Sequence, residues 1–198
     1  MSITKVNADL LDLTDDYAIS GSLASAGSGR ILETLAMVCD GRSVTVGSGT
    51  YTSVAVTSYY TATASYVDLV GSNMTYTPPS GTTAVIYKFS YGIGYVDATS
   101  SIHHKFFIAG TEVTDARRNH TGYYDTGEIV DYNWIIKVGD GDDAASGRLA
   151  TWTSGKELKI QIRVYSTSKE ARIHGTTYWD GAGGSHVTKP TLIITAIS

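Results

Sequence analysis

The stretch from Leu158 to Tyr165 alternates strictly between apolar and polar side chains. Its apolar members are Leu158, Ile160, Ile162 and Val164. A period of two places successive side chains on opposite faces of an extended chain. The run therefore predicts a β-strand with one face in a core and the other at the surface.

Similar runs, rich in Thr, Val and Tyr, recur along the chain between Gly, Pro, Ser and Asp turns. They predict strands at 31–38, 42–46, 50–56, 66–77, 84–91, 102–108, 111–113, 123–124, 129–138, 158–165, 171–176 and 191–197. Many short strands without a repeat of constant length favour a sandwich or jelly roll over a propeller. We therefore expect an all-β fold, an antiparallel jelly-roll-like β-sandwich.

The strand patterns also predict the core and two details of the topology. The predicted core residues are Val85, Phe89, Leu158, Ile160, Ile162, Val164, Leu192 and Ile194. The run 31–38 approaches helical spacing, but it alternates and stops at the turn signal Asp40-Gly41, so we predict a strand. Ala109-Gly110 predicts a tight hairpin, and the last strand is expected to lie centrally in its sheet.

Tyrosine is unusually frequent, with 14 residues against three phenylalanines. Its ring supplies apolar area while its hydroxyl remains polar. Because these tyrosines lie in Thr- and Ser-rich strands, they predict a β-surface that is displayed to water or to a partner.

Charge and cysteine content narrow the function classes. A net charge of −4 gives no electrostatic reason to expect nucleic-acid binding. The single cysteine, Cys39, excludes an intrachain disulfide and follows an apolar run, which predicts a buried thiol. No signal peptide and no apolar run of about 20 residues is present, so we expect synthesis in a cytoplasm and no membrane insertion.

Residues 1–29 differ in composition from the rest of the chain. The acidic stretch 7–16 carries Leu10, Leu11 and Leu13, and a Gly- and Ser-rich connector follows at 21–29. We interpret 1–29 as an attachment arm and 30–198 as the jelly-roll domain. The three leucines are the candidate attachment residues, and an arm folded over its own domain is the alternative.

The sequence contains only weak signals for a metal site. Asp140, Asp142 and Asp143 resemble a fragment of a calcium loop but lack its closing Glu, so a solvated turn is the favoured interpretation. His103 and His104 are adjacent and face opposite ways in a strand, while His120, His174 and His186 show no ligand spacing. We therefore predict no metal and no cofactor.

Candidate catalytic and sugar-binding residues are similarly sparse. Asp125, Glu128 and Asp131 could supply a carboxylate pair for glycoside hydrolysis, but such pairs arise by chance. Trp152 and Trp179 are candidate glycan contacts, although packing is the commoner role of tryptophan. We assign no catalytic residue and predict that the chain is not an enzyme.

Three groups of segments carry a family resemblance. They are Ala8–Leu13 with Tyr17–Gly21 and Gly29–Leu32, then Cys39–Val46 with Tyr76–Thr83 and Phe107–Thr114, and finally Gly175–Gly181 with Lys189–Ile197. In these segments the chain resembles virion proteins of tailed bacteriophages, especially tail-fibre-like or capsid-decorating proteins of marine phages. Unlike long tail fibres, it has no coiled-coil or collagen-like shaft.

The resemblance implies a trimeric jelly roll that is mounted on the particle by its N-terminal segment. We accordingly expect a non-enzymatic virion protein that contacts itself and capsid or tail subunits, with a capsid decoration or head fibre preferred over a tail-fibre tip. The alternative is a carbohydrate-binding receptor-recognition module that contacts a host surface glycan.

Overall fold

The computed structural model describes residues 29–95, 100–122, 127–166, 168, 170–177 and 185–198, and within them the regular structure is entirely β. The strands are β1 (Ile31–Val38), β2 (Ser43–Val46), β3 (Gly49–Thr52), β4 (Tyr60–Thr61), β5 (Val67–Asp68), β6 (Met74–Tyr76), β7 (Ala84–Tyr95), β8 (Ser100–Ile108), β9 (Thr111–Gly122), β10 (Gly127–Lys137), β11 (Lys156–Val164), β12 (Ala171–Ile173), β13 (Gly175–Thr177), β14 (Ser185–Val187) and β15 (Thr191–Ile197). No helix that is long and apolar enough to cross a membrane occurs in this part of the chain.

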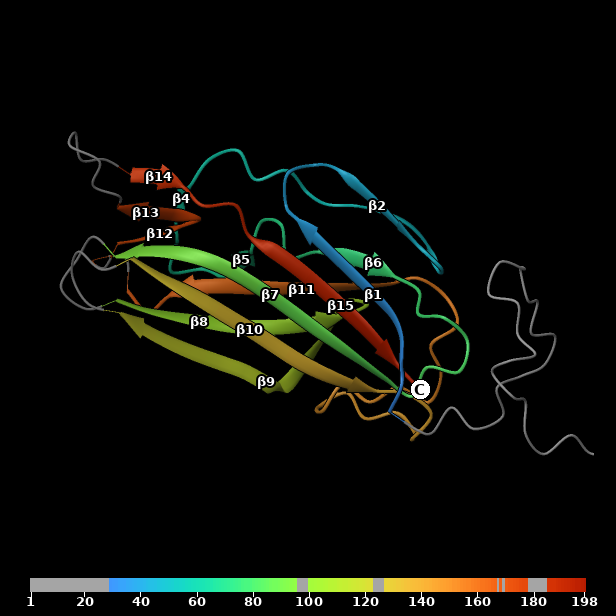
Figure 1. The fold of residues 1–198 in the computed structure, drawn as a ribbon. Coiled ribbons are helices and arrows are strands. Elements are labelled where there is room, and N and C mark those ends of the chain that lie inside the picture. Colours follow the sequence, from blue (N-terminus) through green and yellow to red (C-terminus); the bar gives the residue numbers. More distant parts are fainter. Residues whose placement is uncertain (1–28, 96–99, 123–126, 167, 169, 178–184) are drawn as a thin grey trace, which may run out of the picture.

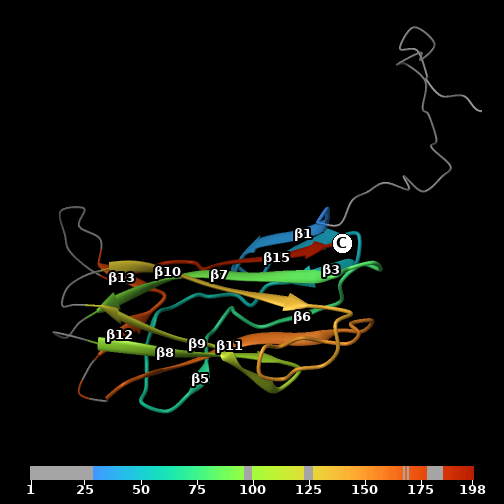
Figure 2. The same cartoon turned by 90° about the horizontal axis from the view of Figure 1, so that it is seen from below.

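Two antiparallel sheets pack face to face (Figures 1 and 2). In the first sheet β15 pairs with both β1 and β7, and β10 pairs with the other side of β7. In the second sheet β11 pairs with β5 and β6 on one side and with β8 on the other, followed by β9. The orders β1-β15-β7-β10 and β6-β11-β8-β9 are those of a double-sheet jelly roll, which confirms the predicted fold class.

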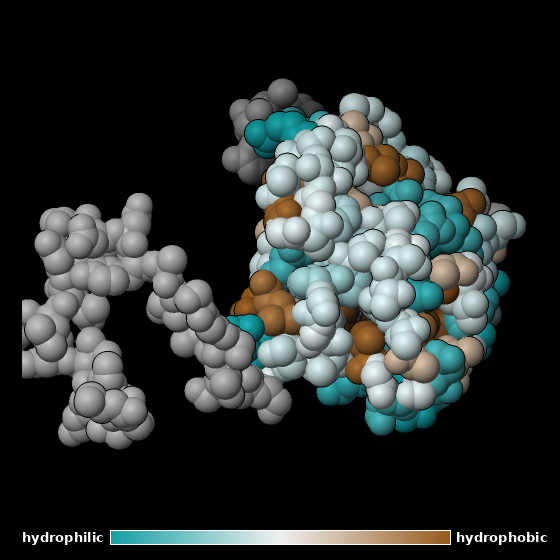
Figure 3. Space-filling view, turned by 90° about the vertical axis from the view of Figure 1, so that its right-hand side faces the viewer, coloured by the Kyte–Doolittle hydropathy of each residue, from teal (hydrophilic) through white to brown (hydrophobic). Residues whose placement is uncertain are grey.

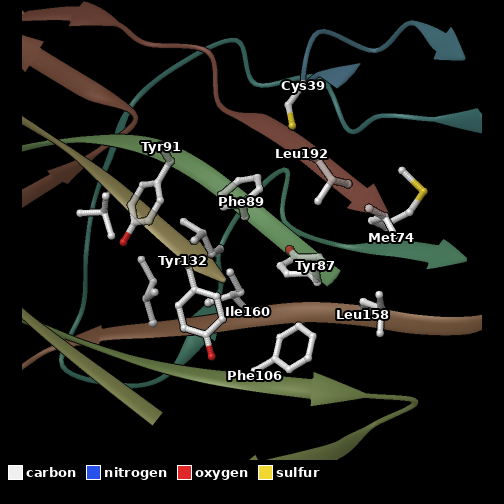
Figure 4. Packing of buried hydrophobic residues seen from close by; sticks show 14 of the residues in the cluster. Cys39, Met74, Tyr87, Phe89, Tyr91, Phe106, Tyr132, Leu158, Ile160 and Leu192 are labelled. Carbon is white, nitrogen blue, oxygen red and sulfur yellow. The ribbon is translucent and has the colours of Figure 1, made fainter. Parts of the chain in front are cut away.

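The core lies between the sheets, and all eight predicted core residues are buried. Contrary to the expectation of a displayed tyrosine surface, Tyr87, Tyr91 and Tyr132 are also buried there (Figure 4), as is Tyr76. Each of these hydroxyls finds a hydrogen-bond partner, which removes the cost of burying it. These four tyrosines therefore stabilise the interior, whereas the side chain of Tyr165 is 73% exposed.

Several strands were located well from the sequence. The predicted ranges 31–38 and 191–197 coincide with β1 and β15, and β15 is central as predicted. The loop Ala109-Gly110 is the predicted hairpin, with positive φ angles of 48° and 81°. The segment 123–124 lies outside the described residues.

Several predicted ranges were wrong in extent. The strand predicted at 50–56 ends at Thr52, and the one predicted at 84–91 continues to Tyr95. The range 66–77 is interrupted by a turn at Val70–Gly71, where Gly71 has φ 89°. The range 171–176 breaks at His174, which has φ 60° and separates β12 from β13. β9 continues far past Val113 to Gly122 because its cross-strand partners on β8 maintain the ladder through a bulge.

Candidate functional site

The acidic loop after β10 uses its carboxylates to close itself. Asp142 accepts a hydrogen bond from the Ala150 backbone N–H at 2.8 Å. Asp143 accepts bonds from the Ala145 N–H and the Ser146 hydroxyl, at 3.1 and 2.7 Å, and forms an ion pair with Arg148. The Ser146 hydrogen bond is the main cause that lowers the pKa of Asp143. This arrangement explains the acidic loop without a cation.

Asp140 lies at the edge of the same loop, 3.8 Å from Arg148. Within the described ranges, no group of three or more His, Cys, Asp or Glu side chains has a geometry that could hold a metal ion. Of the three candidate calcium ligands, Asp142 and Asp143 accept hydrogen bonds within the turn, whereas Asp140 is exposed beside Arg148.

The adjacent histidines His103 and His104 lie on opposite faces of one strand, β8, as predicted. His104 is buried, and His103 is stacked on Tyr165. His120, on β9, pairs with Glu128 on β10. This pair connects the two sheets near one end of the sandwich.

Two buried histidines flank one tyrosine. The His104 Nε2 atom and the Tyr91 hydroxyl lie 2.7 Å apart, and the His174 ring meets the edge of Tyr91 at a centroid distance of 5.8 Å. The Nε2 atom of His174 lies 2.9 Å from the Val70 carbonyl, which accepts its hydrogen bond. Burial lowers the pKa of each imidazole to about 4. Both rings are therefore neutral at pH 7 and serve as polar elements of the core.

The described tryptophan of the candidate glycan pair is a packing residue. Trp152 is only 5% exposed, donates a hydrogen bond to the Tyr76 carbonyl at 3.1 Å, and meets the Tyr76 ring edge-on. Its buried ring offers no free face for stacking on a sugar, so the structure does not support it as a glycan contact. Trp179 and the attachment candidates Leu10, Leu11 and Leu13 lie outside the described residues.

The candidate catalytic carboxylates do not converge. Glu128 and Asp131 are three positions apart on β10, so they lie on opposite faces of the strand. Glu128 pairs with His120, and Asp131 accepts a hydrogen bond from Ser90 and lies 3.8 Å from Lys88. Asp125 is outside the described residues. The described pair therefore lacks the facing geometry that glycoside hydrolysis requires.

Sequence reasoning missed a buried carboxylate on β1. Glu33 is 9% exposed and accepts hydrogen bonds from the Tyr76 hydroxyl, the Ser48 hydroxyl and the Ser48 backbone N–H, at 2.8, 2.6 and 2.7 Å. It thereby joins β1 to the β2–β3 turn and to β6. Its position two residues before Leu35, on the apolar face of the strand, was the available signal.

A polar groove runs between β9 and β10, the outer strands of the two sheets. Its volume is about 170 Å³, and it is lined by Arg118, Asn119 and His120 on β9 and by Asp131 and Asn133 on β10. Guanidinium, amide, imidazole and carboxylate groups together can donate to and accept from a polar ligand. The groove was not predicted, because the distance between two outer strands is a tertiary property.

A larger groove lies beside β1 and β2. It has a volume of about 530 Å³, and Ala36, Val38 and Ile193 form an apolar floor on the outer face of the first sheet. Val44 on β2 and the ion-paired Asp40 and Arg42 border it. Elsewhere, at the end of the molecule that carries Ser198, apolar residues form small separate patches among polar ones (Figure 3).

Comparisons with known proteins give little further information. No family model matches the chain, and no curated protein matches it. A structure of infectious bursal disease virus Gx strain is similar over 86% of this chain and 37% of that chain, with 10% identity and a TM-score of 0.37. A structure of the Gt strain is similar over 81% and 44%, with 12% identity and a TM-score of 0.32. The chain thus spans less than half of either, and at TM-scores this low neither likeness carries an argument.

Proposed function

We propose that this chain is a non-enzymatic structural protein of a tailed-bacteriophage virion, displayed on the particle exterior as a homotrimer. The protein is made in the host cytoplasm and carried on the virion. A capsid decoration or head fibre is preferred over a tail-fibre tip, because the chain has no shaft-forming segment.

The observation that carries this proposal is the jelly-roll strand order of the two sheets. Double-sheet jelly rolls occur in viral capsid proteins, lectin domains and cupins. A fold alone assigns no function, so the sequence resemblance to phage virion proteins supplies the context. A metal-dependent cupin role is disfavoured because the described residues hold no metal-ligand cluster.

Labelling of intact particles tests the virion role. Antibodies raised against the folded protein, with gold detection in electron microscopy, are expected to label the heads of phage particles that encode this chain. Label on fibre tips would move the protein to the tail. Particles that carry neither label nor peptides of this chain in mass spectrometry would overturn the proposal.

The trimer has its own test. Light scattering of the purified full chain should give three chain masses, because association would bury apolar surface that a single sandwich leaves exposed. Exposed residues available for such contacts include Ile129 and Tyr165, at 64% and 73% exposure. A stable monomer at micromolar concentration would count against the trimer.

The arm is the proposed attachment element. Deleting residues 1–20 removes Leu10, Leu11 and Leu13 but none of the described strands. The shortened protein should therefore fold and form the same oligomer as the full chain. It should, however, fail to bind phage particles from which the native protein has been removed. Particle binding that survives this deletion would assign docking to the sandwich.

The second candidate is a carbohydrate-binding module, and the groove between β9 and β10 favours it. Asn119, Asp131 and Asn133 are among the residues that line it, and amide and carboxylate side chains are groups that hydrogen-bond sugar hydroxyls. A glycan array tests this function directly. Glycan binding that is lost in Asn133→Ala and retained in Trp152→Phe would support a carbohydrate-binding function. No binding to any bacterial polysaccharide on the array would exclude this function.

A further inference from the structure

The groove beside β1 has a volume of about 530 Å³ and an apolar floor. Cross-strand pairs Ala36–Ile193 and Val38–Thr191 build this floor, and their side chains point away from the core. Val38 is 39% exposed despite its apolar side chain. Because β1 is the last strand of its sheet on this side, its outer edge is a place where an extended segment can lie.

We propose that this groove binds the acidic segment Asn7–Asp16 of the same molecule. The segment contains Leu11 and Leu13, which share one face when the chain is extended. That face can rest on the apolar floor while Asp12 points away from it. The leucines thus supply the apolar side chains that Ala36, Val38 and Ile193 leave without a partner.

Chain length permits this contact within one molecule. The described chain begins at Gly29, next to β1, and Gly29 is hydrogen-bonded to Ser198. The 13 positions from Asp16 to Gly29 span up to about 45 Å when extended, whereas the five from Ile31 to Ala36 cover about 17 Å of strand. A tether of this length gives the segment a high effective concentration at its own groove.

The charges of the two partners are complementary. The segment carries Asp9, Asp12, Asp15 and Asp16 and no cation. Arg42 borders the groove with 80% of its side chain exposed, and Lys88 lies beside Ile193 on the same face of the sheet. Both cations already have acidic neighbours, so their attraction orients the segment while the leucines provide the contact.

The contact has a regulatory consequence that rests on the proposed function. One segment cannot occupy the groove and a neighbouring virion protein at the same time. The groove would therefore hold the attachment leucines in the free protein and release them when a particle binds. The occupancy of the groove itself does not depend on the virion role and can be tested without particles.

Hydrogen exchange of the full chain, followed by mass spectrometry, provides the test. Amides of residues 7–16 should exchange more slowly in the native chain than in Ile193→Asp, which places a carboxylate in the groove floor. Ile135→Asp is the matched control, because Ile135 is exposed on the same sheet but outside the groove. We expect at least a fivefold acceleration in Ile193→Asp and none in Ile135→Asp, with both variants folded by circular dichroism.

Two further measurements make the result decisive. The double variant Leu11→Ser/Leu13→Ser should accelerate amide exchange of the segment in the same way without altering the sandwich. This variant keeps the proposal testable if Ile193→Asp fails to fold. Protection should be constant between 1 and 100 µM protein. Equal exchange in the native chain and both groove-directed variants would overturn the proposal, and protection lost on dilution would assign the groove to a second molecule instead.

Discussion

The hydroxyl of Tyr76 donates a hydrogen bond of 2.8 Å to the carboxylate of Glu33 in the interior of the sandwich. Tyr76 is fully buried, and Glu33 is nearly so. Since Ser48 supplies two further donors, this carboxylate is solvated by the protein in place of water. The contact ties β1 of the first sheet to β6 of the second.

Glu33→Ala should destabilise the protein. The substitution leaves the Tyr76 hydroxyl and the Ser48 N–H without their acceptor, at about 2–4 kcal/mol in total. We expect the melting temperature to fall by roughly 5–12 °C for a domain of this size. Thr34→Ala, at the neighbouring exposed position, is the control and should change stability by less than about 0.5 kcal/mol. Equal melting of the two variants would show that the buried carboxylate contributes nothing.

Ile160→Asp should prevent cooperative folding, whereas Ile135→Asp should not. Ile160 is fully buried on β11, and an unpaired carboxylate there loses its hydration without compensation. Ile135 is 54% exposed on β10, so the same replacement leaves the new charge in water. Circular dichroism melts of both variants give the comparison. A wild-type-like transition in Ile160→Asp would mean that the β11 side chains face the other way.

Stability should fall as the pH decreases from about 6.5 towards 4, because His104 and His174 have folded-state pKa values of about 4. In the unfolded chain a histidine titrates near 6.5, so below that pH the unfolded state binds more protons. The contribution of the two neutral rings to the free energy of unfolding is fully present above pH 6.5. It amounts to at most about 3 kcal/mol for each ring.

Urea denaturation at pH 7.5, 6.5 and 5.5 measures this dependence before the carboxylates titrate. His174→Asn removes one titrating ring and tolerates the positive φ at this position, so the slope should become shallower. Thr34→Ala, which removes no titratable group, is the control and should leave the slope unchanged. An unaltered slope in His174→Asn would contradict the assignment.

Ala109→Asn should stabilise the hairpin between β8 and β9. Both loop residues have positive φ, and Asn-Gly is the preferred pair for such a two-residue turn. We expect a gain of about 0.5–1 kcal/mol, whereas Ala109→Val should lose a similar amount or more because a β-branched side chain resists positive φ. Chemical denaturation midpoints of the two variants should therefore move in opposite directions.

Local pattern predicted the strands but not their surroundings. Residues 158–165 alternate strictly and residues 191–197 are rich in β-branched side chains, and both ranges were located to within a residue or two. The alternation placed Tyr87 and Tyr91 on the same face as the predicted core residues Val85 and Phe89, against the expectation of a displayed tyrosine surface. It could not show which partners their buried hydroxyls would meet.

The candidate sites were less predictable still. Asp142 and Asp143 resembled a cation loop, yet their oxygens accept bonds from residues within eight positions along the chain. The groove floor combines Ala36 with Ile193, which strand pairing brings together from distant parts of the sequence. Such sites can be identified only when the strand register and the order of strands in the sheet are known.

The pairing of β1 with β15 also bears on how the protein is made. Ile31 pairs with Ile197, and β7 needs β15 to complete the ladder on one of its sides. During synthesis the ribosome must therefore release Thr191–Ile197 before the first sheet can close. Until then β1 has no ladder partner and β7 exposes an open edge, so nascent chains are vulnerable to edge-to-edge association. Contacts this distant in sequence also predict slow folding, and production at low temperature or with chaperones should increase the soluble yield.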